Sequence, residues 1–166
     1  MNLRLAKTDL FAELDETVFT FRERALRDGI EVKYSIPEVP AIANADANRL
    51  KQVFMNILDN ALKYSRSPSK IFVKAEFTKL DNQNFVKIAI ADQGCGISKE
   101  DLPHVKEKFY KANVSVRGSG IGLAVTNEIV NFITENLKLT VKRAKAHLLP
   151  FIFLLKTVRL KMNLMI

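Results

Sequence analysis

The sequence has a single cysteine, no apolar run approaching the length of a membrane span, and no block of lysine and arginine. One cysteine cannot form an internal disulfide, which predicts a reducing compartment. Residues 1–7 lack the apolar region of a secretory signal, and with no long apolar run the sequence predicts neither export nor a membrane span. We therefore expect a cytoplasmic location, with any anchoring in the inner membrane left to other parts of a longer protein.

The composition predicts one globular domain over residues 1–166. Hydrophobic residues make up 48% of the chain and charged residues 27%, which is enough apolar surface for a core and too much for a disordered chain. The sequence has no internal repeat and no low-complexity linker. Its net charge of +8 fits nucleic acid or a pocket for a polyanionic nucleotide, and composition alone leaves both open.

Helical and strand patterns alternate along the chain. Apolar residues at helical spacing predict a helix between Thr8, expected as its N-cap, and Gly29, expected as its end; they are Leu10, Leu14, Val18, Phe21 and Ala25. Alternating patterns predict strands at 30–36, 70–79 and 84–91, the last two joined by a hairpin connection at 80–83. Residues 148–155 also suit a strand, which Pro150 would restrict to a sheet edge.

The segment Gln52–Tyr64 predicts a helix with two different faces. Val53, Ile57 and Ala61 fall on one side, whereas a polar row occupies another, made of Asn56, Asn60, Lys63 and Tyr64. An amide oxygen is a ligand that a hard cation accepts, and a lysine one turn away can meet a phosphate. In isolation the row is equally consistent with a helix that merely carries amides.

The second strand of the hairpin ends in an acid followed by two glycines. Asp92 could accept a hydrogen bond from an exocyclic amine, and Gly94 and Gly96 would let the backbone approach a planar ligand. In isolation, a tight turn ending in Asp is the simpler interpretation. Cys95 lies between the glycines without a basic neighbour, and we expect a small buried side chain rather than a reactive thiol.

A third segment, Gly118–Gly122, is rich in glycine and runs into a helical pattern. Such a turn directs free N–H groups and the positive end of the helix dipole toward an anion. Alone the motif is weak, because no strand precedes it as in a dinucleotide-binding fold and it lacks the lysine of a P-loop.

In this order, the three segments resemble the ATP-binding boxes of the ATPase superfamily shared by histidine kinases, heat-shock chaperones, type II topoisomerases and mismatch-repair proteins. Residues 56–64 resemble the N box, 92–96 the first glycine box and 118–122 the second. Residues 102–111 resemble the F box of the histidine-kinase branch, with Lys106 in place of its first aromatic residue. The resemblance covers about residues 8–130, and residues 131–166 depart from it.

The resemblance implies an α+β fold, a two-layer α/β sandwich with a mixed, largely antiparallel sheet, helices on one face and a mobile ATP lid. Asn60 would ligate Mg²⁺ and, with Lys63 and Lys111, form the catalytic set, while Asp92 would accept from the adenine amino group. The implied nucleotide-binding residues are Asn56, Asn60, Lys63, Tyr64, Asp92, Gly94, Gly96, Ile97, Tyr110, Lys111, Arg117, Gly118, Ser119, Gly120, Ile121, Gly122 and Leu123.

The implied function is transfer of the γ-phosphoryl group of Mg-ATP to a histidine on a separate dimerisation domain, with a response regulator downstream. Hydrolysing members of the superfamily carry a Glu base four residues before the metal-binding Asn, where this sequence has Asn56. The alternative is a nucleotide-gated regulatory module without transferase activity, such as a degenerate kinase or an anti-sigma-factor-like protein. Nucleic-acid binding is disfavoured because the basic residues form no stripe.

Two departures from the family stand out. Neither His104 nor His147 has the helical setting of a phospho-acceptor, so we expect both to be surface or packing residues. The family's Gly-Thr-x-Phe strand is replaced by residues 144–156, although one codon set for 146–156, read one nucleotide earlier, yields Gly-Thr-Ser-Phe. We hypothesise a frameshift near residues 131–145, and an unbroken frame in the source DNA would refute it.

Overall fold

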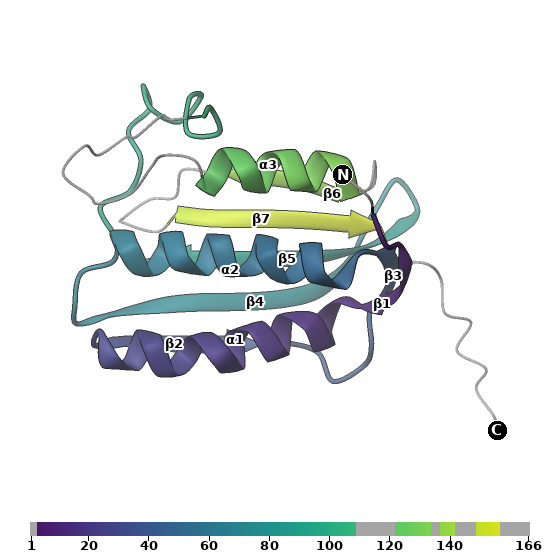
Figure 1. Cartoon of the computed structure of the whole chain (residues 1–166), viewed down its shortest axis with the longest axis horizontal. Coiled ribbons are helices and arrows are strands. Elements are labelled where there is room, and N and C mark those ends of the chain that lie inside the picture. Colours follow the sequence, from purple (N-terminus) through teal and green to yellow (C-terminus); the bar gives the residue numbers. More distant parts are fainter. Residues whose placement is uncertain (1–2, 109–121, 134–136, 142–148, 157–166) are drawn as a thin grey trace.

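The computed structural model describes residues 3–108, 122–133, 137–141 and 149–156. Within them, helices cover one face of a five-stranded sheet, and a small two-stranded sheet lies at one end (Figure 1). The helices are α1 (Leu10–Arg27), α2 (Ala47–Tyr64) and α3 (Gly122–Ile133). The strands are β1 (Ala6–Asp9), β2 (Ile30–Ser35), β3 (Ile42–Ala45), β4 (Ser69–Leu80), β5 (Gln83–Asp92), β6 (Leu137–Val141) and β7 (Leu149–Lys156).

The sheet has the order β2-β4-β5-β7-β6, and only the β2–β4 pair is parallel. This confirms the expected α+β sandwich with a mixed, largely antiparallel sheet. The period of two in β4 decides which face is covered, since Ile71 and Val73 are buried whereas Phe72 between them is 38% exposed. Val86, Ile88 and Ile90 of β5 are buried on the same side, against α1 and α2.

The first helix has the predicted core, and all five of its apolar positions are buried. Its N-cap is Asp9, so the expectation of Thr8 was wrong. The Asp9 carboxylate accepts hydrogen bonds from the N–H groups of Phe11 at 3.1 Å and Ala41 at 3.0 Å. Thr8 lies in β1, where its hydroxyl donates to the Ala45 carbonyl at 3.0 Å. The helix ends at Arg27 with Asp28 as its C-cap, and the predicted stop, Gly29, follows directly with a φ of 73°.

The second helix begins at an N-cap that ties it to the two-stranded sheet. The Asp46 carboxylate accepts from the N–H groups of Arg49 at 3.2 Å and Arg4 at 2.9 Å. The Arg4 hydrogen bond is the largest contribution that lowers the pKa of Asp46. The predicted buried row of α2 is confirmed, because Val53, Ile57 and Ala61 are all at most 1% exposed. The apolar side of α2 thus packs against the sheet, and its polar row lies at the edge of this contact.

The β4–β5 hairpin turns more tightly than predicted. The strands extend to Leu80 and Gln83, so the connection is Asp81 and Asn82 alone, with φ values of 49° and 60°. Two consecutive positive φ values are typical of the turn that suits the right-handed twist of a hairpin. The consequence for the site is the register, which sets Asp92 opposite Ile71 at the end of β5.

The last predicted strand lies inside the sheet, so its assignment to an edge was wrong. β7 pairs with β5 on one side and β6 on the other. Pro150 pairs with Ala91 on the β5 side, and Phe151 next to it pairs with Val141 of β6.

None of the described helices combines the length and the apolar character that crossing a membrane requires.

Candidate functional site

The first two segments singled out in the sequence, and Gly122 at the end of the third, lie at one end of the described part of the molecule (Figure 1). The C-terminal end of α2, the end of β5 and the beginning of α3 lie on the same side in Figure 1. The antiparallel hairpin brings Asp92 back to the end of the sheet at which β4 starts, a few residues after α2 ends. The topology thus brings polar residues that are far apart in the sequence to the same end of the sheet.

Gly94 joins the first two segments by direct packing. A Cβ added at Gly94 would lie 2.3 Å from the carbonyl oxygen of Tyr64 and 2.6 Å from Oδ1 of Asp92. Its N–H donates to the Asp92 carboxylate at 2.8 Å. A side chain at this position would collide with the α2 backbone, so the close approach of loop and helix requires glycine. The contact brings together Tyr64, Asp92 and Gly94, three of the candidate residues named from the sequence.

Asp92 is an acid held away from water. Its side chain is 1% exposed, and burial raises its pKa to about 6. Hydrogen bonds from the N–H groups of Gly94 and of Asp92 itself oppose the shift by stabilising the carboxylate. A buried carboxylate with spare acceptor capacity is suited to a neutral hydrogen-bond donor such as an amine on a base.

Tyr64 and Lys63 occupy the last turn of α2. The Lys63 ammonium lies 5.1 Å from the centroid of the Tyr64 ring, within the range of a cation–π contact. Burial raises the pKa of the Tyr64 phenol, and Cys95 adds a smaller effect in the same direction. Cys95 therefore lies close to this turn, but its side chain is exposed, and the expectation of a small buried residue was wrong. The flanking glycines provide no neighbouring side chains that could cover it.

Asn56 connects α2 to α3. Its side-chain Nδ2 donates to Oγ1 of Thr126 at 3.2 Å, and Thr126 is fully buried. The two helices pack side by side and run antiparallel (Figure 1). Asn60 lies one turn after Asn56, and Gly122 one turn before Thr126, so Asn60 is level with the first residue of α3. The amide row of α2 thus borders a helix N-terminus, whose N–H groups favour anions.

Thr126 is a functional candidate that the sequence reasoning missed. It lies on the buried face of α3 with Ile129 and Val130, three and four residues later. A polar residue at a core position of an amphipathic helix was the available signal. An ion pair that the sequence did not suggest joins Lys108 to Glu128 of α3 at 2.6 Å, and thus holds the end of the segment 98–108 against α3.

The first glycine box continues with a backbone requirement at Gly96. This residue has a φ of 72°, which disfavours side chains, although a Cβ would meet no atom within 4 Å. Ile97 is partly buried against the core. Gly122 and Leu123 are the first residues of α3. The predicted residues Tyr110, Lys111, Arg117, Gly118, Ser119, Gly120 and Ile121 lie outside the described residues, as do the ATP lid and His147.

The donor set suits a cation held jointly with a ligand rather than by the protein alone. Among the described residues, no group of three His, Cys, Asp or Glu side chains could hold a metal. Asn60 is half-buried on the polar row and supplies a neutral amide oxygen. Mg²⁺ commonly keeps several waters and binds through one or two protein oxygens plus substrate phosphates, so this composition fits it.

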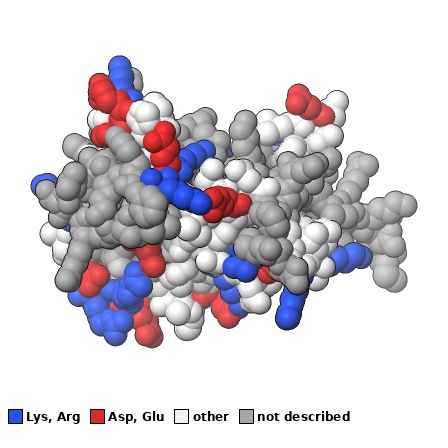
Figure 2. Space-filling model, turned by 45° about the horizontal axis from the view of Figure 1, so that its top comes forward, with Lys and Arg blue, Asp and Glu red and all other residues white. Residues whose placement is uncertain are grey.

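The charged side chains of the described residues are mixed in sign on one face of the molecule (Figure 2). On the face drawn in Figure 2, basic and acidic side chains lie next to one another. His104 is exposed, as expected, and its Nδ1 lies 2.8 Å from the Glu107 carboxylate.

Comparison with known proteins agrees with this geometry. The sequence profile of the family described as histidine kinase-, DNA gyrase B-, and HSP90-like ATPase matches residues 45–156. The non-motile and phage-resistance protein of Caulobacter vibrioides is 31% identical over 134 residues, which are 78% of this chain and 16% of that protein. The signal transduction histidine-protein kinase BaeS of Escherichia coli is 32% identical over 75% of this chain and 27% of its own length.

Among solved structures, the catalytic domain of histidine kinase ThkA superposes with a TM-score of 0.79. The match covers 93% of this chain and 96% of that domain at 20% identity, and it confirms the fold. The chain thus spans less than a third of the length of the two curated relatives, but nearly all of a solved catalytic domain. The similarity to histidine kinases does not favour the alternative of a regulatory module without transferase activity.

Proposed function

This chain belongs to the family of histidine kinase-, DNA gyrase B- and HSP90-like ATPases, as a domain of the histidine-kinase type, and we propose that it binds Mg-ATP between α2, the end of β5 and α3. The reaction that we assign to it is transfer of the γ-phosphoryl group to a histidine of a separate dimerisation domain. The single observation that carries this proposal is the packing of Gly94 against Tyr64 and Asp92, which joins a buried acid to the polar row of α2.

We assign the adenine end of the site to the residues around Asp92. Its buried carboxylate accepts a hydrogen bond from the exocyclic amino group of the base, which guanine cannot supply at that position. Gly96 leaves its backbone open beside the ring, whereas Gly94 lets the loop pack against the Tyr64 carbonyl; Ile97 and the Tyr64 ring provide apolar surface. This environment favours adenine because a guanine carbonyl oxygen would face the carboxylate and leave it unpaired.

We assign the triphosphate end to the amide row and the beginning of α3. Asn60 would hold Mg²⁺ through its amide oxygen, with Asn56 supporting the same site and Lys63 pairing with phosphate. The metal neutralises phosphate charge when it is bound. The N–H groups at the start of α3 face the same region, since Gly122 is level with Asn60. From the resemblance, we also assign phosphate contacts to Lys111 and Arg117, and nucleotide contacts to Tyr110 and residues 118–123, of which only 122 and 123 are described.

The chemistry that we propose requires positioning more than covalent participation by the protein. An imidazole nitrogen of the acceptor attacks the γ-phosphorus, the bond to the bridging oxygen breaks, and ADP leaves with that oxygen. Water does not compete efficiently, because Asn56 occupies the position where a Glu would take its proton, and an amide cannot act as that base. Its Nδ2 is already committed as a donor to Thr126.

The partners follow from the same proposal. The acceptor histidine belongs to a dimerisation domain outside this chain, and a response regulator would then receive the phosphoryl group. We infer a cytoplasmic site of action, because that is where ATP is available, with any membrane attachment through other parts of the full protein.

Two measurements test the proposal. Calorimetry should detect binding of Mg-ATP to the chain, with markedly weaker binding after chelation of Mg²⁺. With γ-labelled ATP and the separate acceptor domain of a related histidine kinase, the chain should produce acid-labile phosphohistidine. ATP binding without phosphohistidine on any acceptor domain, including one fused to this chain, would instead support a regulatory module. Absence of ATP binding would refute the site itself.

A further inference from the structure

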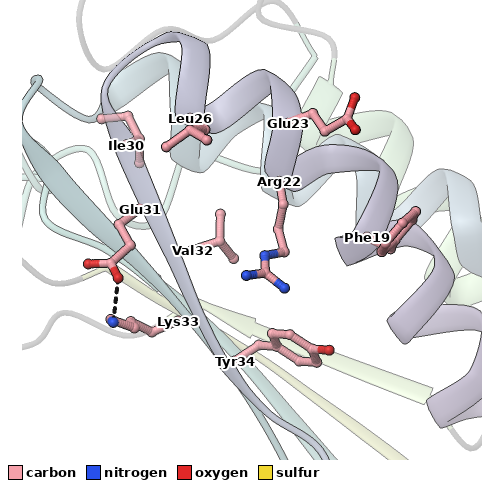
Figure 3. A pocket seen from close by; sticks show the side chains of 9 residues that line it. All are labelled: Phe19, Arg22, Glu23, Leu26, Ile30, Glu31, Val32, Lys33 and Tyr34. Carbon is pink, nitrogen blue, oxygen red and sulfur yellow. Dashed lines mark ion pairs between the residues drawn. The ribbon is translucent and has the colours of Figure 1, made fainter.

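A groove separates α1 from β2 at the edge of the molecule opposite α3. Its volume is ≈ 480 Å³, and its lining comes from the C-terminal half of α1 and from β2 (Figure 3). The described residues include no strand beyond β2, whose only sheet partner is β4. The groove therefore accompanies an open sheet edge, and neither feature takes part in the proposed nucleotide site.

The helix side of the groove carries an apolar and charged stripe. Phe19 and Leu26 are each 73% exposed, which is unusual for large apolar side chains. Arg22 and Glu23 lie between them, at the three- and four-residue spacing that aligns side chains along one helix face. The order along the stripe is therefore apolar, basic, acidic, apolar.

Strand β2 has an apolar side, which faces the helices, and a charged side, which faces away from them. Ile30, Val32 and Tyr34 point to the helix side of the sheet, where the Arg22 guanidinium lies 5.5 Å from the centroid of the Tyr34 ring. Glu31 and Lys33 point to the other side, both about half exposed, and form an ion pair with each other. Lys70 of β4 also lies 3.7 Å from Glu31.

We propose that this α1–β2 face, defined by Phe19, Arg22, Glu23, Leu26 and residues 30–34, binds the same face of a second copy of the chain about a two-fold axis. On α1 the axis passes between Arg22 and Glu23, so that each arginine meets the other copy's glutamate and each Phe19 meets a Leu26. At β2 it passes midway between Val32 and the Val32 of the other copy, so that Glu31 meets Lys33 and Ile30 meets Tyr34. Both patterns are self-complementary in charge and in hydrophobicity.

One axis can serve both elements. The Gly29 N–H donates to the Leu26 carbonyl at 3.0 Å, so Leu26 and Ile30 lie at the same level of the groove. The midpoint between Arg22 and Glu23 is then about 5 Å along the helix from that level. Val32 is about 7 Å along the strand from the same level. The point between Arg22 and Glu23 on α1 and the position of Val32 on β2 therefore lie at nearly the same level. One two-fold axis can then relate both elements to those of the second copy.

The physical balance favours a weak but specific dimer. Charged side chains on an edge strand ordinarily prevent pairing with other chains. Here an antiparallel copy of β2 centred on Val32 sets Glu31 opposite Lys33. A register shifted by two residues would instead set two glutamates or two lysines opposite one another. Association would cover Phe19 and Leu26, and the exposed ion pairs would add orientation more than affinity.

Sedimentation equilibrium of the whole chain provides the test, at concentrations up to about 1 mM, where weak association is detectable. We expect concentration-dependent dimers. The variant Arg22→Glu sets glutamates opposite one another in the homodimer, and Glu23→Arg sets arginines opposite one another. Because like charges across an interface repel, each variant alone should weaken dimerisation by about tenfold or more. An equal mixture of the two variants should restore it, since every pair in the mixed dimer is again of opposite sign.

Leu26→Asp provides a matched check, because a side chain 73% exposed can change without loss of the fold. We expect it to abolish dimers while Mg-ATP binding and the thermal midpoint stay within error. A chain that is monomeric at about 1 mM would overturn the proposal and leave the face to a different protein. Dimers that survive both charge variants equally, or a mixture that does not restore association, would also overturn it.

Discussion

The side-chain amide of Asn56 on α2 donates a hydrogen bond to the fully buried hydroxyl of Thr126 on α3, with 3.2 Å between nitrogen and oxygen. This bond sets the register of two antiparallel helices. It also orients the amide, because Nδ2 is the donor and the Oδ1 acceptor is left for other partners. The register in turn brings Asn60 level with the beginning of α3.

The first prediction concerns this contact. Thr126→Val keeps the shape of the side chain but removes the acceptor, so we expect a loss of about 1–2 kcal/mol in the free energy of unfolding. Mg-ATP should also bind several-fold more weakly, because Asn56 loses its orientation. Urea denaturation and calorimetry measure the two effects. Thr126→Ser retains the hydroxyl and should preserve ATP affinity. An equal loss of ATP affinity in both variants would show that the hydroxyl is not what orients Asn56.

The second prediction tests Asn60 as the metal-binding residue. Asn60→Asp adds a negative charge beside the proposed triphosphate site, and we expect Mg-ATP affinity to fall by about tenfold or more. Titrations with and without Mg²⁺ should show that the metal dependence changes. Asn48→Asp is the matched control, since it adds the same charge at an exposed position near the start of α2. Affinity that changes equally in both variants would point to net charge alone.

The third prediction follows from the pKa of Asp92, which burial raises to about 6 from an ordinary value of 3.8. The neutral acid is favoured in the folded protein, so this group's contribution to stability is complete below about pH 4 and is lost as the pH rises through about 6. Above that pH, ionisation of the buried carboxyl lowers the free energy of unfolding by up to about 3 kcal/mol. Asp92→Asn should therefore be more stable than the parent at about pH 8, with the difference vanishing below about pH 4.

Denaturation of both proteins across this pH range measures the difference, in which the titration of all other groups cancels. A variant that is less stable than the parent at every pH would mean that the carboxylate is stabilised by its hydrogen bonds more than it is destabilised by burial.

The fourth prediction concerns the selectivity that we assign to the same residue. Asp92→Ala removes the acceptor for the adenine amino group, so ATP affinity should fall by about tenfold and the preference for ATP over GTP should disappear. Competition between the two nucleotides measures the preference. Glu76→Ala, which removes an acid from the solvent side of β4, is the control and should leave it intact. Retained preference for ATP in Asp92→Ala would remove Asp92 from the site.

The fifth prediction compares two glycines of one loop. Gly94→Ala would set a methyl group 2.3 Å from the Tyr64 carbonyl oxygen, so the loop must move away from α2 and ATP binding should be lost. Gly96→Ala meets no atom within 4 Å and carries only the cost of its φ of 72°, about 1–2 kcal/mol. Calorimetry measures the ATP affinity of the two variants and thermal unfolding measures their stability. Together they distinguish the steric clash at Gly94 from the backbone strain at Gly96. Near-equal ATP binding by the two variants would contradict the proposed role of the Gly94 contact.

Local patterns predicted most of the secondary structure. The apolar stripes of α1 and α2 and the alternation in β4 and β5 depend on the 3.6- and 2-residue periods, which any amphipathic element must show. Short elements were missed, because four residues at Ala6–Asp9 and at Ile42–Ala45 carry too little pattern and form strands only through each other. Thr8 was misassigned for the same reason, since its hydroxyl is used by β3.

The family was readable from residue order alone, and the polar candidates were proposed from it, because the spacing of amides on a helix and of glycines after an acid is visible without coordinates. The placement of β7 between β5 and β6, the burial of Asp92, the exposure of Cys95 and the bond from Asn56 to Thr126 were not readable in this way. Each depends on which segments, distant in the chain, come to lie against one another, and a one-dimensional pattern does not record such contacts.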